Sequence, residues 1–389
     1  PVAAAVPTPV AVVPAEPKRV YLFNTPRYHY EVMLPLLSLF TGLENVNVEL
    51  FCGRNGWQRF GVRPLMDYYA NDNLQLTECY NNDCKALRQR VKEPYFSPPE
   101  VIYLTTCPED MDVLDDLLLW FLAGGTHVIC TVHESQKWNL NVPAHEELSP
   151  YQKQINFMIP WIKRGQWHLA TLSEHVQKYV HNNFPTYFQT GSEVEYNPLL
   201  FYPTSRPTFK SDISIRQDPA FVAIVGKLEP WRRNYDAIFK QYIEFNPPLA
   251  LELIGNAGLV LPKVPASIKD NVTFVSGLEF PEYFQEIAEA VAIVPSFAND
   301  FYIHSQASSS IATSVTVGTP PLLTQEMLDA YAYVPENAAW IQLDNETEVE
   351  AVARIADLGP AVWKEHKQSM QTVRGELIQR NLALFQSFM

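Results

Sequence analysis

Short runs of β-branched and aromatic residues alternate with longer amphipathic runs from Lys18 onward. The short runs have the composition of buried strands, and the longer runs carry apolar residues at i, i+3 and i+4 spacing, which predicts helices. This alternation is typical of a parallel sheet covered by helices, so the first half predicts a Rossmann-like domain. The predicted strands are Arg19–Phe23, Val46–Phe51, Glu100–Thr105, His127–Val132 and Trp167–Leu172, and the predicted helices are Tyr30–Phe40, Met111–Ala123, Tyr151–Lys163 and Val176–Asn182.

A second alternation follows a proline-containing stretch, residues 197–219, which has little periodicity and indicates a connection between domains. We therefore expect two Rossmann-like α/β domains, residues 18–198 and 199–364, that face each other across a cleft. The last stretch is helical in pattern with no strand after it, so we expect residues 365–389 to pack back on the first domain. The second set of predicted strands is Phe221–Val225, Leu251–Ile254, Val272–Val275 and Val291–Val294, and the helices are Tyr235–Tyr242, Pro281–Ala288, Gln306–Val317 and Pro360–Met389.

Composition and charge narrow the range of ligands. The 389-residue chain is long enough for two domains, and a hydrophobic content of 47% is sufficient for full cores. Its formal net charge is −14, and its lysines and arginines are scattered, so we expect no nucleic-acid partner. An acidic protein that binds an anionic nucleotide must concentrate positive charge locally, and one cluster does so at Lys227, Arg232 and Arg233.

The five cysteines lie in the first third of the chain and form no CxxC pair, so no structural zinc is expected. Cys107 and Cys130 stand at the end of, or inside, apolar runs that predict core strands, which favours buried reduced thiols. Cys79 and Cys84 could form a local disulfide.

The ends of the chain and two short motifs bear on its location. Residues 1–17 are almost wholly Pro, Ala and Val, which predicts an extended linker or stem, and a membrane tether upstream of residue 1 would suit it. Asn271-Val-Thr273 and Asn345-Glu-Thr347 match the N-glycosylation acceptor pattern. The longest apolar stretch, residues 113–125, is too short to span a bilayer. These features predict the lumen of the secretory pathway, Golgi or endoplasmic reticulum, with the cytoplasm as the alternative.

A strand, a glycine and several cations stand together where the second domain begins. The apolar run Phe221–Val225 is followed by Gly226, Lys227 and then Arg232 and Arg233, just before a predicted helix. A diphosphate site needs such parts, because glycine lets the backbone approach, cations neutralise charge, and helix N–H groups donate hydrogen bonds. The alternative is a strand that ends in a solvated basic turn.

This segment resembles the opening of the second domain in GT-B glycosyltransferases, where strand-Gly-Arg-Leu is followed by a lysine. In that family the two cations hold the diphosphate of a nucleotide sugar, which implies this role for Lys227 and for Arg232 or Arg233. Other segments resemble family motifs in the same order and extend the resemblance from Arg19 to about Thr324. They are Thr131-Val-His-Glu134, Ala170-Thr-Leu-Ser-Glu174, Asn197-Pro198, Gly255-Asn-Ala-Gly258 and Phe274-Val-Ser-Gly-Leu278.

The chain departs from the large retaining group of this family at the donor site. That group carries two glutamates eight positions apart before a Gly-x-Pro, which is Gly318-Thr-Pro320 here. The matching positions hold Ser305 and Thr313, so the chain resembles a divergent member that lacks both glutamates.

A hydroxyl-rich segment occupies this part of the chain instead. Ser308, Ser309 and Ser310 lie near a predicted helix start, where hydroxyl and N–H groups could hold a phosphate without a carboxylate. Tyr302 and His304 precede them and are candidate contacts to the donor. The alternative is a serine-rich helix cap with no ligand.

Candidate groups for the chemistry follow the strands of the first domain. His133 closes a predicted strand on the cleft side, where an imidazole can bind a sugar hydroxyl or take a proton, and a structural histidine is the alternative. Glu134 could act as the base for an acceptor hydroxyl if the reaction inverts. Arg27, Tyr28 and His29 follow the first strand and are expected to line the acceptor side, with ordinary loop packing as the alternative.

The resemblance implies transfer of a hexose from a UDP- or GDP-linked sugar to a hydroxyl of a glycan or another acceptor, with retention of configuration. Cations would neutralise the leaving diphosphate, so no metal and no further cofactor are expected. Asp110-Met-Asp112 has the letters of a metal-binding DxD motif, but it falls at a helix start, where capping explains it. Two alternatives stay open, a GT-B-like sugar-nucleotide epimerase and a non-catalytic relative that binds glycans or nucleotides.

Overall fold

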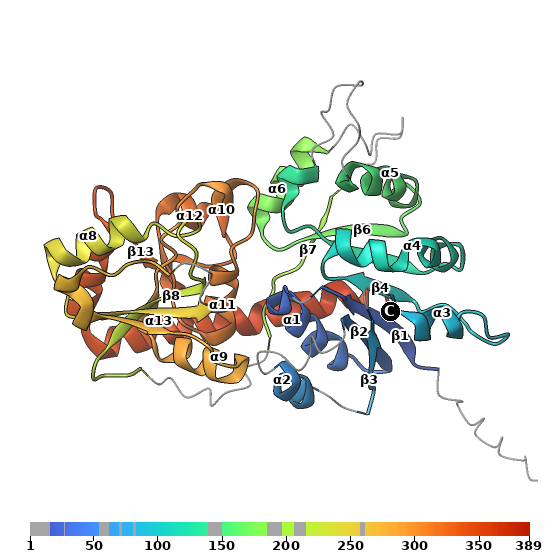
Figure 1. Ribbon diagram of the computed structural model, residues 1–389, viewed down its shortest axis with the longest axis horizontal. Coiled ribbons are helices and arrows are strands. Elements are labelled where there is room, and N and C mark those ends of the chain that lie inside the picture. The colour runs from blue at the N-terminus through green and yellow to red at the C-terminus, as the bar shows by residue number, and fades with distance from the viewer. Residues whose placement is uncertain are drawn as a thin grey trace, which may run out of the picture.

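The structure, a computed structural model, has two α/β domains arranged side by side (Figure 1). It describes residues 16–26, 28–53, 62–69, 72–80, 83–138, 150–184, 197–205, 215–256 and 261–389. Each domain has a parallel sheet with helices on its faces, so the expected fold class of two Rossmann-like domains is confirmed.

The first domain is built on a parallel sheet with the strand order β3-β2-β1-β4-β5-β6-β7. Its central strands are apolar on both faces because helices cover both sides, which is why they were recognisable in the sequence. The strands are β1 (Lys18–Asn24), β2 (Val46–Gly53), β3 (Leu74–Cys79), β4 (Val101–Leu104), β5 (His127–Thr131), β6 (Trp167–Thr171) and β7 (Leu199–Leu200). The α-helices are α1 (Tyr30–Thr41), α2 (Val62–Tyr69), α3 (Lys85–Arg90), α4 (Cys107–Ala123), α5 (Pro150–Ile162) and α6 (Glu174–Asn183).

The second domain repeats this strand order. Strands β10-β9-β8-β11 form one parallel sheet, and a bridge between Ile293 and Pro321 continues it to the β12-β13 pair. The strands are β8 (Phe221–Lys227), β9 (Ala250–Asn256), β10 (Val272–Val275), β11 (Ala292–Ile293), β12 (Leu322–Leu323) and β13 (Trp340–Ile341). The α-helices are α8 (Tyr235–Phe245), α9 (Phe280–Glu289), α10 (Phe301–His304), α11 (Ser309–Val317), α12 (Gln325–Ala330) and α13 (Glu348–Gln386).

Helix α13 joins the two domains. The part of α13 before Gly359 packs in the second domain, the chain kinks at Gly359, where φ is 77°, and the helix then runs along the second domain before it reaches the first (Figure 1). Near its end Phe385 is buried against Phe40, Tyr103 and Phe201. The C-terminal helix returns to the first domain as expected, whereas the start of this packing at residue 365 stays a prediction. No helix within the described ranges combines the length and apolar character needed to cross a membrane.

The domains meet along a continuous apolar core, in which α1 packs beside α11 and α2 beside α9. Strand β7, the last before the second domain, pairs with β6, so Leu199 and Leu200 belong to the first sheet. The boundary at residue 198 stays a prediction, because neighbouring side chains from both domains share one core here.

The cysteines correct one expectation and confirm another. Cys107 and Cys130 are not free thiols: they form a buried disulfide, with Cα atoms 5.2 Å apart. The physical reason is the strand register, which pairs Leu104 with Cys130 and so places the start of α4 over β5. The local disulfide between Cys79 and Cys84 is present, and Cys52 is a buried free thiol.

Candidate functional site

The glycine at the end of β8 opens space beside two polar groups. Gly226 has φ of 104°, a conformation that residues with a side chain rarely adopt. A Cβ atom built there would lie 3.8 Å from Nη2 of Arg233 and 4.0 Å from Oγ of Ser309. The next residue, Lys227, is exposed and has no ion-pair partner among the described residues. The turn thus brings a glycine, an arginine and a serine together.

Arg233 is a buried cation whose hydrogen bonding is incomplete. Its side chain is 4% exposed, and Nη2 donates to the Val225 carbonyl at 3.1 Å and to Ser310 Oγ at 2.6 Å. Its Nε and Nη1 atoms have no hydrogen-bond partner among the residues that the structure describes. Burial lowers the pKa of Arg233, but an arginine remains charged at physiological pH. Two donor nitrogens of a buried charge are therefore available to an anion.

Arg232 is fixed by contacts within the second domain. Its Nε pairs with Glu229 Oε2 at 2.8 Å, and Nη1 donates to the Tyr302 hydroxyl at 3.2 Å. The Tyr302 ring stacks on Phe297 with centroids 4.8 Å apart, and the Arg233 guanidinium lies 5.4 Å from the Phe297 ring centroid. Arg232 and Tyr302 therefore form the wall next to Arg233.

The three serines at the start of α11 differ in their surroundings. Ser308 is the N-cap, and its Oγ accepts from Ser310 N at 3.2 Å while its own N–H donates to the Tyr331 hydroxyl at 3.0 Å. Ser310 is buried, and its Oγ contacts Arg233. Ser309 is exposed and faces Gly226. Of the predicted phosphate cradle, only Ser309 presents its hydroxyl to solvent.

His304 lies away from this group. It is the last residue of the short helix α10, its side chain is 57% exposed, and its Nε2 is 3.6 Å from Asp300 Oδ2. It does not contact Arg233 or the α11 serines in any recorded hydrogen bond.

Two stacked histidines form the first domain's side of the site. His133 follows β5, its Nε2 donates to the Thr105 carbonyl at 2.7 Å, and its ring lies on His29 with centroids 3.7 Å apart. Burial, aided by the nearby His29, lowers the pKa of His133 to about 3, so the ring is neutral at pH 7. Because Nε2 carries the proton, Nδ1 presents a lone pair.

Glu31 adds a carboxylate beside the two stacked histidines. The sequence analysis did not identify it as a site residue. Its Oε1 lies 2.9 Å from His29 Nδ1. Burial alone would raise the pKa of Glu31, but the charge and hydrogen bond of His29 lower it to about 2. Glu31 lies in the first turn of α1, where an acidic residue is common for helix stability, so the sequence offered no signal of a site.

The other predicted acceptor residues are described in part. Tyr28 is 42% exposed, packs edge-on against His29 at 4.9 Å, and its hydroxyl donates to Glu109 Oε1 at 2.5 Å. Arg27 lies outside the described residues. Glu134 points its carboxylate at Lys137 in an ion pair, and its backbone bridges Gln306 of the second domain. No recorded contact joins the Glu134 carboxylate to His133.

The loop before α11 is docked on the first domain. Ser135 Oγ donates to the Ser305 carbonyl at 2.6 Å. His175 of α6 places Nε2 3.0 Å from the Gln306 carbonyl and Nδ1 2.9 Å from the Ala330 carbonyl. These contacts join residues more than 130 positions apart in sequence, so no local pattern predicted them.

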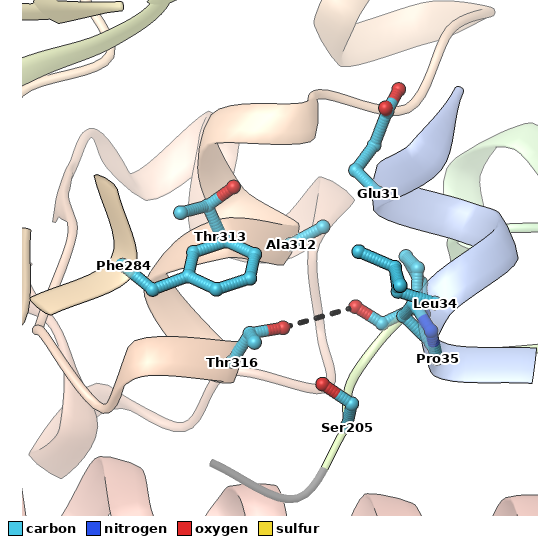
Figure 2. A pocket seen from close by; sticks show the side chains of 9 residues that line it. Glu31, Leu34, Pro35, Ser205, Phe284, Ala312, Thr313 and Thr316 are labelled. Carbon is cyan, nitrogen blue, oxygen red and sulfur yellow. Dashed lines mark hydrogen bonds between the residues drawn. The ribbon is translucent and has the colours of Figure 1, made fainter. Parts of the chain in front are cut away.

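A small hollow, partly open to solvent, lies between α1 and α11 (Figure 2). Glu31 of α1 and Thr313 and Thr316 of α11 are among the residues that line this hollow (Figure 2). Burial and the charge of Glu31 raise the pKa of Tyr283, whereas Arg233 opposes the rise. The Glu31 carboxylate and the Arg233 guanidinium thus both influence the same tyrosine.

The segment Asp110-Met-Asp112 has the letters of a metal-binding DxD motif, but its first aspartate has a structural role. Asp110 is buried and accepts hydrogen bonds of 2.7–2.9 Å from the N–H and hydroxyl groups of Thr25 and Thr106. Thr106 is the N-cap of α4, so Asp110 closes the helix start and ties it to the loop after β1. Among the described residues, no group of three or more potential ligands gathers as a metal site.

No protein-family model and no curated protein matches the chain by sequence. Solved structures match it nearly end to end. A glycosyltransferase from Rickettsia africae is 10% identical with a TM-score of 0.63, and the match covers 96% of this chain and 99% of that one. The HepE protein of Anabaena, solved with UDP and glucose, is 12% identical with a TM-score of 0.58, covering 95% and 98%.

Sucrose-phosphate synthase from Thermosynechococcus elongatus is 12% identical with a TM-score of 0.56, covering 95% of this chain and 97% of that one. At these identities the similarity concerns the fold. The chain therefore has the GT-B fold, the two-domain architecture of these glycosyltransferases.

Proposed function

We propose that the protein is a glycosyltransferase that moves a sugar from a nucleoside diphosphate to a hydroxyl group of a glycan or another acceptor. The observation that carries this proposal is Arg233, a buried cation whose Nε and Nη1 atoms have no hydrogen-bond partner within the described ranges. An unpaired buried donor costs about 1–3 kcal/mol, and more when it is charged. A diphosphate against these atoms would remove that cost.

The surroundings of Arg233 suit a diphosphate. Gly226 leaves room for the phosphate oxygens, Ser309 offers a hydroxyl, and Lys227 supplies a second cation at the mouth. The start of α11 adds the positive end of a helix dipole. These groups stabilise the charge that develops on the leaving diphosphate, so the proposed reaction requires no metal. UDP is the preferred nucleotide because HepE, of the same fold, was solved with UDP and glucose.

The first domain offers side chains that can bind the acceptor and accept the proton of its hydroxyl group. The acceptor oxygen forms a bond to the anomeric carbon, the bond from that carbon to the diphosphate breaks, and the hydroxyl proton must move to a base. His29 suits this role because Glu31 holds Nδ1–H and leaves Nε2 as the basic atom. The Nδ1 lone pair of His133 can accept a hydrogen bond from a sugar hydroxyl. Tyr28 and Arg27 stay proposed acceptor contacts.

The stereochemical outcome has two candidates. The resemblance to the large retaining group favours retention. The His29–Glu31 pair favours inversion, because a direct displacement by an acceptor hydroxyl needs a base on the protein. Nuclear magnetic resonance of the product's anomeric proton, recorded early in the reaction, distinguishes the two.

The proposal is tested with the full chain and a panel of UDP- and GDP-sugars. Transfer or slow donor hydrolysis supports a glycosyltransferase. Formation of an isomeric nucleotide sugar would instead indicate an epimerase. Nucleotide binding without turnover would indicate a non-catalytic relative, which the absence of glutamates at Ser305 and Thr313 favours as the second candidate.

The variant Arg233→Met tests the placement of the diphosphate. We expect UDP affinity, measured by calorimetry, to fall about 10- to 100-fold, because charge-assisted hydrogen bonds contribute about 1.5–3 kcal/mol. Replacing an unpaired buried charge by an apolar side chain should leave the melting temperature equal or higher. Lys240→Ala, an exposed charge on α8, is the matched control and should bind normally. Unchanged affinity in Arg233→Met would refute this diphosphate site.

A further inference from the structure

Two surface triplets have no role in the proposed reaction. Asn345-Glu-Thr347 and Asn271-Val-Thr273 match the acceptor pattern for N-linked glycans. Asn345 lies in the turn between β13 and α13, is exposed, and has φ of 65°. Its side-chain amide makes no recorded hydrogen bond with the described residues.

The threonine of the first triplet also has a role in helix stability. Thr347 is the N-cap of α13, and its Oγ1 accepts from Glu350 N at 3.2 Å in a capping box. Asparagine is also favoured over most residues at positive φ. A second, independent observation is therefore needed to indicate modification.

The disulfides supply that observation. Four of the five cysteines are paired, Cys79 with Cys84 and Cys107 with Cys130. Such bonds persist in the secretory pathway and outside the cell and are rare in the cytosol. A chain that matures where disulfides form also meets the machinery that glycosylates Asn-x-Thr triplets.

We infer that the chain matures in the secretory pathway and carries an N-linked glycan on Asn345. In this reaction the Asn345 Nδ2 atom forms a bond to the anomeric carbon of a lipid-linked oligosaccharide. The bond from that carbon to the lipid diphosphate breaks, the diphosphate leaves, and Nδ2 loses one proton. The inference is independent of the proposed transferase activity.

The second triplet provides an internal comparison. Asn271 is partly buried, and its Nδ2 donates to Asn246 Oδ1 at 3.2 Å. A glycan on Nδ2 has to be accommodated beside this contact, whereas Asn345 has no such neighbour bonded to it. We therefore expect higher occupancy at Asn345 than at Asn271.

The test begins with the protein captured from its native cells by an antibody. Release of glycans by a peptide amidase in ¹⁸O-labelled water converts a glycosylated asparagine to labelled aspartate, which mass spectrometry locates. We expect the label at Asn345. When the thiols are alkylated without prior reduction, we expect Cys52 to be the one cysteine that reacts. An unlabelled Asn345, or alkylation of Cys107 and Cys130, would overturn the inference.

Two variants separate the acceptor role of Thr347 from its capping role. Thr347→Ser keeps both the cap and the triplet, so the glycan should remain. Thr347→Asp keeps a good N-cap but destroys the triplet, so the glycan should be lost while the melting temperature stays within a few degrees. If the two variants carry the same mass at Asn345, the triplet does not direct modification.

Discussion

The local environment of His133 changes the protonation of its imidazole. Burial lowers its pKa to about 3, whereas an unfolded chain protonates histidine near pH 6.5. The unfolded state therefore takes up a proton that the folded state refuses, so the stabilisation is complete above pH 6.5 and is lost as the pH falls. Between pH 6.5 and 4.5, we expect the free energy of unfolding of the wild type, measured in urea, to fall by up to about 1.4 kcal/mol per pH unit more than that of His133→Gln. Parallel curves would show that His133 takes up its proton equally in the folded and unfolded states, and that burial does not lower its pKa.

The crossing helix α13 has a specific anchor. Phe385 is buried, with ring centroids 5.1 Å from Phe40, 5.8 Å from Tyr103 and 5.8 Å from Phe201. We expect Phe385→Ala to lower the free energy of unfolding of the first domain by about 3–5 kcal/mol, measured in urea by circular dichroism. Leu358→Ala, at an exposed position of the same helix, should change it by less than about 0.5 kcal/mol. A loss below 1 kcal/mol for Phe385→Ala would argue against this anchor.

Strands that are buried on both faces could be predicted from the sequence. Strands with exposed positions were difficult to predict. Strand β8 is apolar along its buried length, so its position was evident in the sequence. Strand β3 was missed because it is an edge strand whose exposed positions hold polar residues such as Gln75 and Glu78. The Cys107–Cys130 disulfide was missed because it depends on the register of β4 and β5, which the sequence alone does not reveal.

At the scale of the whole molecule, the two-domain architecture could be predicted, but the contacts between the domains could not. The order of strands and helices along each half is sufficient to specify a Rossmann-like domain. The pairing of Ser135 with the Ser305 carbonyl joins residues 170 positions apart and involves types that are common in any loop. Glu31 and Thr313 line one hollow for the same reason, since only the docked domains bring α1 and α11 together.

His175 is the contact through which domain docking can be tested. Its two ring nitrogens lie 2.9 Å from the Ala330 carbonyl and 3.0 Å from the Gln306 carbonyl, both in the second domain. Gln306 lies two positions before Ser308, the N-cap of α11, so loss of this contact should open the domains and displace the proposed donor site. We expect His175→Ala to increase the radius of gyration in small-angle X-ray scattering and to weaken UDP binding, while Lys178→Ala, exposed on the same helix, changes neither. A His175→Ala protein with wild-type scattering would show that the shared apolar core alone holds the domains together, and the donor site would then be independent of this histidine.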